Sequence, residues 1–273
     1  MKSVLVTGCS SGIGRCIAEG LRHSSYNVFA TVRKQVDIDN LKSAGFDAVH
    51  LDLTDSSSIR SAVDYVLNKT SGELYGLVNN AAYGQTGAVE DLDRQALRDQ
   101  FETNLFGTQE LTNLILPVMR KQNEGRIIQI SSVLGFVTMR FRGAYCASKY
   151  ALEALSDAMR YELHGTGIKV SLIEPGPIKS EFRNNALKNY QRAVNKDNSL
   201  HAESYAKVEK EMNTENYTVP FTLGPEAVLA KVIHALESNN PKNRYYVTVP
   251  TYLFAYLKRV LPGSLLDKIL VKI

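Results

Sequence analysis

Tyr145 and Lys149 are the two side chains of this sequence whose types and spacing point most directly to proton transfer. The stretch that follows them, 151–160, has the character of a helix. Residues four apart share a helix face, so the phenol and the ammonium can approach each other. A free tyrosine has a pKa of about 10 and is a poor base near neutrality. A fixed positive charge lowers that pKa and would allow proton exchange near pH 7. Taken alone, the pair has a plainer explanation as ordinary neighbours on a helix.

A glycine-rich segment near the N-terminus, Thr7 to Gly14, reads Thr-Gly-Cys-Ser-Ser-Gly-Ile-Gly. It follows a short apolar run and opens a helical pattern, which is the context that a nucleotide-binding loop requires. The glycines allow a tight turn, a close approach to a pyrophosphate and close helix packing, and the helix N-terminus offers N–H groups to the negative charge. The residues expected to bind the cofactor here are Gly8, Ser10, Ser11, Gly12, Ile13 and Gly14.

The second expected strand, 28–32, is followed by Arg33 and Lys34. An acidic residue at this place would bind the hydroxyls of an adenosine ribose and repel a 2′-phosphate. Two cations instead favour the phosphorylated ribose, and therefore NADP(H) over NAD(H). The alternative is a solvated pair of surface charges.

Three further strand ends carry residues that could face a ligand, because ligands of parallel α/β sheets bind outside the carboxyl ends of the strands. Asp52 could accept from the adenine amino group, with Leu53 beside it. Asn80 and Ala81 could hold loops and face a ribose, and Ser132 could donate to a substrate carbonyl. Each of these positions is also compatible with ordinary turn or capping chemistry.

Short apolar segments alternate with helical stretches, which is typical of βαβ units in a parallel sheet covered on both faces. The expected strands are 4–6, 28–32, 48–51, 74–78, 126–130, 169–173 and 245–249. The expected helices are 13–21, 36–44, 55–68, 93–121, 144–164 and 224–237. Right-handed crossovers then predict an α/β, doubly wound Rossmann fold with a seven-stranded parallel sheet in the order 3-2-1-4-5-6-7 and helices on both faces.

The sequence predicts one domain over 1–273, with two departures from the regular pattern. Residues 182–218 are polar and show no strong period, so we expect 182–222 to be an irregular insertion that serves as a substrate-binding lid. Residues 251–273 form an apolar tail with interleaved cations, expected to be helical. Packing of this tail on the body or on a second subunit is favoured over contact with a membrane surface.

The composition of the 273-residue chain is that of an ordinary globular protein, with 44% hydrophobic residues and a net charge of +4. The charge is too mild and too scattered to favour nucleic-acid binding. Three cysteines, without metal-ligand spacing, argue against a disulfide framework and for a reducing compartment, the cytoplasm. Strand-like sequence begins at Ser3, leaving no room for a signal peptide, and no apolar run reaches the ~20 residues that span a bilayer.

The order and spacing of Thr-Gly-x-x-x-Gly-x-Gly, Asn-Asn-Ala, Asn, Ser, Tyr-x-x-x-Lys and Pro-Gly over about residues 2–180 resemble the short-chain dehydrogenase/reductase family. The chain is most similar to its hydroxysteroid and retinol dehydrogenase branch and, within it, to bacterial NADP-dependent aldehyde reductases. Ala82 departs from the family's Asn-Asn-Ala-Gly, and the region after 183 follows no shared pattern.

The resemblance implies a role for each matching residue. Tyr145 exchanges a proton with the substrate oxygen as hydride is transferred, Ser132 orients and polarises that oxygen, and no metal is needed. Lys149 lowers the pKa of Tyr145 and binds the nicotinamide ribose, and Asn104 holds a water that connects Lys149 to solvent. The nicotinamide end is contacted by Pro175, Gly176 and Ile178. The surfaces of 93–121 and 144–164 pair in the family, which implies a homodimer or homotetramer.

These features predict an NADP(H)-dependent oxidoreductase that interconverts a lipophilic aldehyde or ketone and its alcohol, with a pocket lined by Tyr83, Leu134 and Met139. The alternative from another class is a protein that senses NADP(H) without catalysis; such a protein would be expected to lose the tyrosine or the lysine. A nucleotide-sugar epimerase or dehydratase is disfavoured, because those relatives are longer and have a different glycine spacing.

Overall fold

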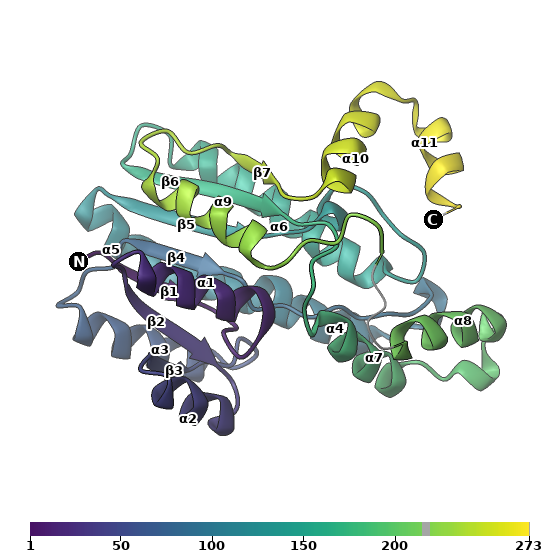
Figure 1. Cartoon of the computed structure of the whole chain (residues 1–273), viewed down its shortest axis with the longest axis horizontal. Helices are drawn as coiled ribbons and strands as arrows, with labels where there is room; N and C mark the ends of the chain where they lie inside the picture. The colour runs from purple at the N-terminus through teal and green to yellow at the C-terminus, as the bar shows by residue number, and fades with distance from the viewer. Residues whose placement is uncertain (215–218, 273) are drawn as a thin grey trace.

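A parallel sheet of seven strands in the order β3-β2-β1-β4-β5-β6-β7 forms the centre of the protein (Figure 1), as expected from the sequence. The computed structural model describes residues 1–214 and 219–272. The strands are β1 Ser3–Val6, β2 Asn27–Val32, β3 Asp47–His50, β4 Gly76–Asn79, β5 Gly125–Ile130, β6 Ile168–Glu174 and β7 Arg244–Tyr246. The first seven helices are α1 Gly12–His23, α2 Gln35–Ser43, α3 Ser56–Lys69, α4 Arg94–Phe101, α5 Gly107–Gln122, α6 Gly143–Glu162 and α7 Phe182–Ala193. The last four are α8 Ala202–Asn213, α9 Glu226–Glu237, α10 Val249–Val260 and α11 Gly263–Leu270.

Two apolar cores cover the two faces of the sheet. On one face α1, α2 and α9 pack through residues such as Ile17, Leu41 and Val232. On the other face α3, α5 and α6 pack through residues such as Ile59 and Leu111. Strands buried on both faces must be apolar along their whole length, which explains why they appear in the sequence as short uninterrupted apolar runs.

The helical stretch expected at 93–121 is interrupted. The α4 helix ends at Phe101, a π turn occupies Glu102–Phe106, and α5 begins at Gly107. The start of α5 passes so close to the end of β3 that a Cβ on Gly107 would lie 1.8 Å from the carbonyl oxygen of Leu53. The extra residue in the π turn lets the chain change helical register at this contact, and such turns are frequent at functional sites.

The segment expected to be irregular, 182–218, contains two helices, α7 and α8, in its described part; residues 215–218 lie outside the described residues. The buried side of these helices includes Tyr190 and Tyr205, whose ring centroids are 5.3 Å apart. They pack on Leu92 and Ala144 of the body. Tyrosines fill buried positions that large aliphatic residues occupy in the other helices. A search for aliphatic periodicity in the sequence therefore does not detect α7 and α8.

The C-terminal tail forms the helices α10 and α11, and one face of α10 packs on the body. Thr251 and Ala255 of α10 are buried, whereas Tyr252, Leu253 and Tyr256 on its other face are at least half exposed. Figure 1 shows α7 and α8 below, and α10 and α11 above, at the end of the sheet towards which the strands point. In the described part of the chain, no helix combines the length and the apolar composition that crossing a bilayer requires.

Candidate active site

The glycine-rich loop between β1 and α1 has the conformation that its sequence predicts. Gly8 and Gly12 have φ values of +72° and +56°, in the left-handed region that favours glycine. Gly14 lies inside α1, where a Cβ would come within 2.2 Å of the Gly8 carbonyl oxygen. Ser11 is the N-cap and makes no side-chain capping bond, so the first N–H groups of α1 keep their capacity to bind an anion. This arrangement fits a dinucleotide diphosphate.

Thr7 and Asn80 fasten the glycine-rich loop to the segment after β4. The Thr7 hydroxyl accepts hydrogen bonds from the backbone N–H groups of Asn80 and Ala81, each at 2.9 Å. The Asn80 side-chain amide donates to the carbonyl oxygens of Thr7 at 2.8 Å and Gly8 at 3.2 Å. Of the two roles expected for this asparagine, holding loops is therefore the one for which the structure provides contacts.

Arg33 and Lys34 lie at the exposed end of β2, beside the glycine-rich loop. The loop is tied to the same strand by a hydrogen bond from the Cys9 N–H to the Thr31 carbonyl oxygen at 2.9 Å. The two cations are thus brought to the edge of the sheet where the sequence places an adenosine ribose.

Asp52, after β3, is engaged in a local turn. Its Oδ1 accepts from the backbone N–H of Thr54 at 2.9 Å and from the Thr54 hydroxyl at 2.8 Å. Leu53 is buried against the start of α5. Ordinary turn chemistry therefore accounts for part of this motif, and its contact with adenine stays a prediction.

Tyr145, Lys149 and Ser132 come together at the carboxyl end of β5. Tyr145 and Lys149 lie on the first turns of α6, and the Lys149 ammonium is 5.8 Å from the centre of the Tyr145 ring. The Ser132 hydroxyl is hydrogen-bonded to the Tyr145 phenol. Lys149 donates to the Ile130 carbonyl oxygen at 2.7 Å, which fixes its ammonium behind the end of the strand.

Burial dominates the electrostatics of this group. It raises the pKa of Tyr145 to about 12, although the Ser132 hydrogen bond and the charge of Arg142 act in the opposite direction. Burial also lowers the pKa of Lys149 to about 8, against the attraction of the Glu153 carboxylate. The sequence predicts that Lys149 lowers the pKa of the phenol, but burial is the largest influence on that pKa in the structure and raises it.

Asn104 lies in the π turn, and its side chain holds the loop after β4. Its Oδ1 accepts from the Tyr83 N–H at 3.0 Å and its Nδ2 donates to the Tyr83 carbonyl oxygen at 2.9 Å. Nδ2 also donates at 3.1 Å to the Ser148 hydroxyl on α6. The asparagine thus joins the π turn, the loop and the helix that carries Tyr145, and its expected water-holding role stays a prediction.

The loop after β6 contacts both the segment that carries Ser132 and the glycine-rich loop. The Pro175 carbonyl oxygen accepts from the Val133 N–H at 2.8 Å, next to Ser132. Further along, the Cβ of Ser180 would lie 3.0 Å from a Cβ on Gly12. Gly176 and Ile178, between these contacts, are therefore held at the same carboxyl edge as the glycine-rich loop and Ser132.

Phe182, the first residue of α7, covers Tyr145, and no sequence motif indicated this contact. The two ring centroids are 5.3 Å apart in an edge-on arrangement. Gly84 lies below them, where a Cβ would come within 2.8 Å of the Phe182 ring. Tyr145 is consequently only 8% exposed.

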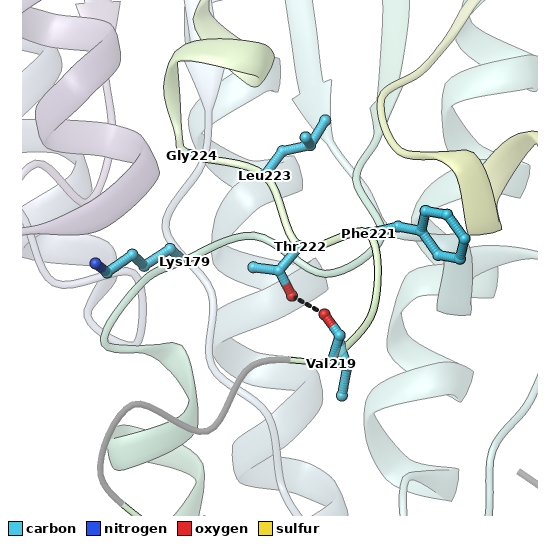
Figure 2. A pocket seen from close by; sticks show the side chains of 6 residues that line it. All are labelled: Lys179, Val219, Phe221, Thr222, Leu223 and Gly224. Atoms are coloured by element: carbon cyan, nitrogen blue, oxygen red, sulfur yellow. Dashed lines mark hydrogen bonds between the residues drawn. The ribbon is translucent and has the colours of Figure 1, made fainter.

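A hollow of about 290 Å³ lies against residues 219–224, and Tyr145 is not among the residues that line it. Figure 2 shows Phe221, Thr222 and Leu223 around it, with Lys179 at its edge. The Thr222 hydroxyl donates to the Val219 carbonyl oxygen at 2.7 Å. The Lys179 N–H donates to the Leu223 carbonyl oxygen at 2.9 Å, and the Leu223 N–H donates to the Pro177 carbonyl oxygen at 3.2 Å, which joins this segment to the loop after β6.

Comparisons with known proteins agree with this geometry. Residues 2–191 match the family model described as short chain dehydrogenase. The "Uncharacterized oxidoreductase YbbO" of Escherichia coli (strain K12) is 46% identical over 98% of this chain and 94% of that protein. The "NADPH-dependent 3-dehydrocapnine reductase" of Ornithobacterium rhinotracheale is 34% identical over 100% of this chain and 97% of that protein.

A solved structure of a short-chain dehydrogenase from Streptomyces avermitilis superposes with a TM-score of 0.76 at 30% identity, covering 95% of this chain and 93% of that one. The family match extends over more than half of the chain and contains the glycine-rich loop, Ser132, Tyr145 and Lys149. The chain therefore belongs to the short-chain dehydrogenase/reductase family of nicotinamide-dependent oxidoreductases.

Proposed function

We propose that the protein is an NADP(H)-dependent oxidoreductase that reduces an aldehyde or ketone to an alcohol, or catalyses the reverse reaction. The observation that carries this proposal is the meeting of Tyr145, Ser132 and Lys149 at one strand end. The glycine-rich loop lies at the same edge of the sheet. We place the enzyme in the cytoplasm, because its three cysteines show no disulfide pattern.

In this proposal the bound nicotinamide supplies or accepts the hydride, and the protein manages the proton. Tyr145 donates its phenolic proton to the substrate oxygen in reduction and removes it in oxidation. Ser132, already hydrogen-bonded to that phenol, holds the same oxygen and polarises it. Lys149 keeps a positive charge behind the phenol and binds the ribose next to the nicotinamide, while Asn104 fixes the surrounding loop.

NADP(H) is favoured by Arg33 and Lys34, which can pair with a 2′-phosphate. The diphosphate would be held by the loop from Gly8 to Gly14, and the nicotinamide end by Pro175, Gly176 and Ile178. The description of the O. rhinotracheale relative as NADPH-dependent supports the same preference.

We propose a lipophilic substrate because a substrate must pass apolar and aromatic side chains to reach the phenol of Tyr145. Phe182 packs on Tyr145, and Leu134 follows Ser132 in a short turn. Met139, 38% exposed, and the half-buried Tyr83 are further candidates for the wall of the pocket. We assign 182–222 as the lid of this pocket within a single domain, 1–273.

The enzyme is proposed to be a homodimer or homotetramer assembled through α4, α5 and α6. This face bears a hollow of about 390 Å³ lined by residues that include Phe106 and Leu155, both exposed apolar side chains. The exposed face of α10 is a second candidate for subunit packing, and we retain this in preference to a membrane contact.

Replacement of Tyr145 by phenylalanine tests the function. The variant keeps the ring that packs on Phe182 and loses the proton donor, so we expect turnover of a panel of lipophilic aldehydes and ketones to fall at least ~10²-fold. NADPH binding, followed by fluorescence titration, should persist. Wild-type activity with unchanged turnover in the variant would overturn the mechanism. NADPH binding without activity in the wild type, over the whole panel and in both directions, would favour the non-catalytic sensor.

A further inference from the structure

A cluster of buried charges lies directly behind the candidate active site, between α6 and the last two strands. Arg244 of β7 is at its centre. Its guanidinium contacts Glu153 at 3.1 Å and Asp157 at 2.7 Å, both on α6, and Glu174 at 3.1 Å, at the end of β6. The side chain of Glu174 is fully buried and that of Glu153 is 10% exposed. Asp157 is also paired with Arg160 at 2.7 Å.

The carboxyls of this cluster outnumber the guanidiniums that contact them, which favours a proton on one carboxyl. Three carboxyls contact two guanidiniums, and Glu174 is the fully buried member of the three, where a negative charge is most costly. Burial raises the pKa of Glu153, and two N–H groups of Arg244, at 3.1 and 3.2 Å, oppose this by stabilising its charged form. Glu174 is the more buried partner, and burial together with the neighbouring Glu153 raises its pKa to about 9. The proton therefore resides mainly on Glu174, and Glu153 carries the charge.

Glu153 also interacts with Lys149 and with Ser131, the residue before Ser132. It follows Lys149 by four residues on the same helix face, and its charge opposes the loss of the proton from that lysine. The Ser131 hydroxyl interacts with it, and Ser131 precedes Ser132. Its partner Glu174 precedes Pro175, whose carbonyl oxygen accepts from the N–H of Val133.

We propose that Glu153 is a positioning residue of the enzyme, an ionised carboxylate on the same helix face as Lys149 that keeps this lysine protonated. This inference rests on the proposed function and names a residue outside the catalytic motif. The other charged groups that influence the cluster are Lys258 and Arg259 of α10, and both are cations. Their positive charges lower the free-energy cost of ionising Glu153. They also extend the cluster to the C-terminal tail.

The direct test measures the protonation of Lys149 in the holoenzyme. Protein labelled with ¹³C at lysine Cε is titrated by NMR with NADP⁺ bound, and the Lys149 signal is assigned by its loss in Lys149→Arg. In Glu153→Gln we expect the titration midpoint of Lys149 to fall by about one pH unit. Glu153→Asp, which retains the charge, should recover part of that shift. Glu162→Gln, an exposed glutamate on the same helix, is the matched control and should leave the midpoint in place.

Kinetics give a second readout. With the residual NADPH-dependent reduction followed against pH, the alkaline loss of kcat in Glu153→Gln should move to lower pH by a similar amount. An equal loss of kcat at every pH, with an unmoved Lys149 midpoint, would mean a merely structural role and would overturn the proposal. If no carbonyl substrate is reduced by the wild type, the proposed function fails, and the NMR titration still decides the role of Glu153.

Glu174→Gln distinguishes which carboxyl holds the proton. Because the pKa of Glu174 is raised on folding, its contribution to stability decreases as pH rises from about 4.5 towards 9. Glutamine mimics the protonated acid without this pH dependence. The Tm of Glu174→Gln minus the Tm of the wild type should therefore be larger at pH 8 than at pH 5. A relative loss at pH 8 would show that an ionised Glu174 is required and would overturn the assignment of the proton.

Discussion

At the scale of single residues, Arg33 offers the sharpest test of cofactor choice. It follows β2 at the edge where the Thr31 carbonyl oxygen binds the glycine-rich loop, and its side chain is exposed. An ion pair with a 2′-phosphate exists only in NADP(H), so Arg33→Ala should weaken NADPH binding by about tenfold or more and NADH binding hardly at all. Isothermal titration with both cofactors measures this difference.

The companion variants for this prediction are Lys34→Ala and Arg22→Ala. Lys34 should share part of the phosphate interaction and show a smaller selective loss. Arg22, in the last turn of α1, hydrogen-bonds to the Ala44 carbonyl oxygen at 2.7 Å, so its removal tests a loss of positive charge away from the glycine-rich loop. Parallel losses for NADPH and NADH in Arg33→Ala would exclude the 2′-phosphate role.

At the scale of secondary-structure elements, α6 organises the site. Tyr145, Lys149, Glu153 and Asp157 recur every four residues along it and are progressively further from its N-terminus. The first two face the proposed substrate, and the last two are held by Arg244. One helix thus couples the proton donor to the buried cluster, and a shift of α6 along its axis would disturb both.

The contact between the start of α5 and Leu53, in the turn after β3, is a second element-scale feature, and it yields a prediction on stability. A methyl group at Gly107 would lie 1.8 Å from the Leu53 carbonyl oxygen, a backbone atom that cannot move aside as a flexible side chain could. Gly107→Ala should therefore lower the free energy of unfolding by about 1–3 kcal/mol or more. Urea unfolding followed by circular dichroism measures this. Gly263→Ala, at the start of α11 with no atom within 4 Å of the added methyl, is the control and should change little.

The elements differ in how far the sequence could predict them. The strands, their parallel order and the glycine-rich loop follow from local patterns, and Gly8 and Gly12 have the positive φ angles that the motif requires. The π turn at Glu102–Phe106 adjoins the contact of Gly107 with Leu53, a residue distant in the sequence, and no local pattern indicated it. Such features become visible only when distant segments meet.

The candidate site shows the same division. Ser132, Tyr145 and Lys149 could be chosen by type and spacing, and the structure brings them together. Phe182 and Glu153 could not be chosen. One lies in a polar segment without a motif, and the other looks like an ordinary glutamate on a helix until Arg244 and Glu174 pack against it.

At the scale of the whole molecule, the face formed by α5 and α6 should bury its apolar residues between subunits. Phe106 is 52% exposed and Leu155 38% exposed, around the hollow of about 390 Å³. A carboxylate in the middle of a buried interface costs several kcal/mol, so Leu155→Glu should convert the oligomer into monomers. Light scattering coupled to size-exclusion chromatography measures the mass.

The control for this prediction is Val36→Glu, an equally abrupt change at an exposed apolar residue of α2, remote from α5 and α6. It should leave the mass of the assembly unchanged. An unchanged mass in Leu155→Glu, with a multimeric wild type, would move the interface elsewhere, and the exposed face of α10 would be the next candidate.

The packing of Phe182 on Tyr145 has a consequence for the reactivity of the resting enzyme. With its ring edge-on at 5.3 Å, Phe182 shields the phenol from dissolved reagents as well as from substrate. A reagent that nitrates tyrosine would thus modify Tyr145 only during the moments when α7 moves away. The rate of that modification would therefore measure how often the proposed lid opens, and the measurement would require no knowledge of the natural substrate.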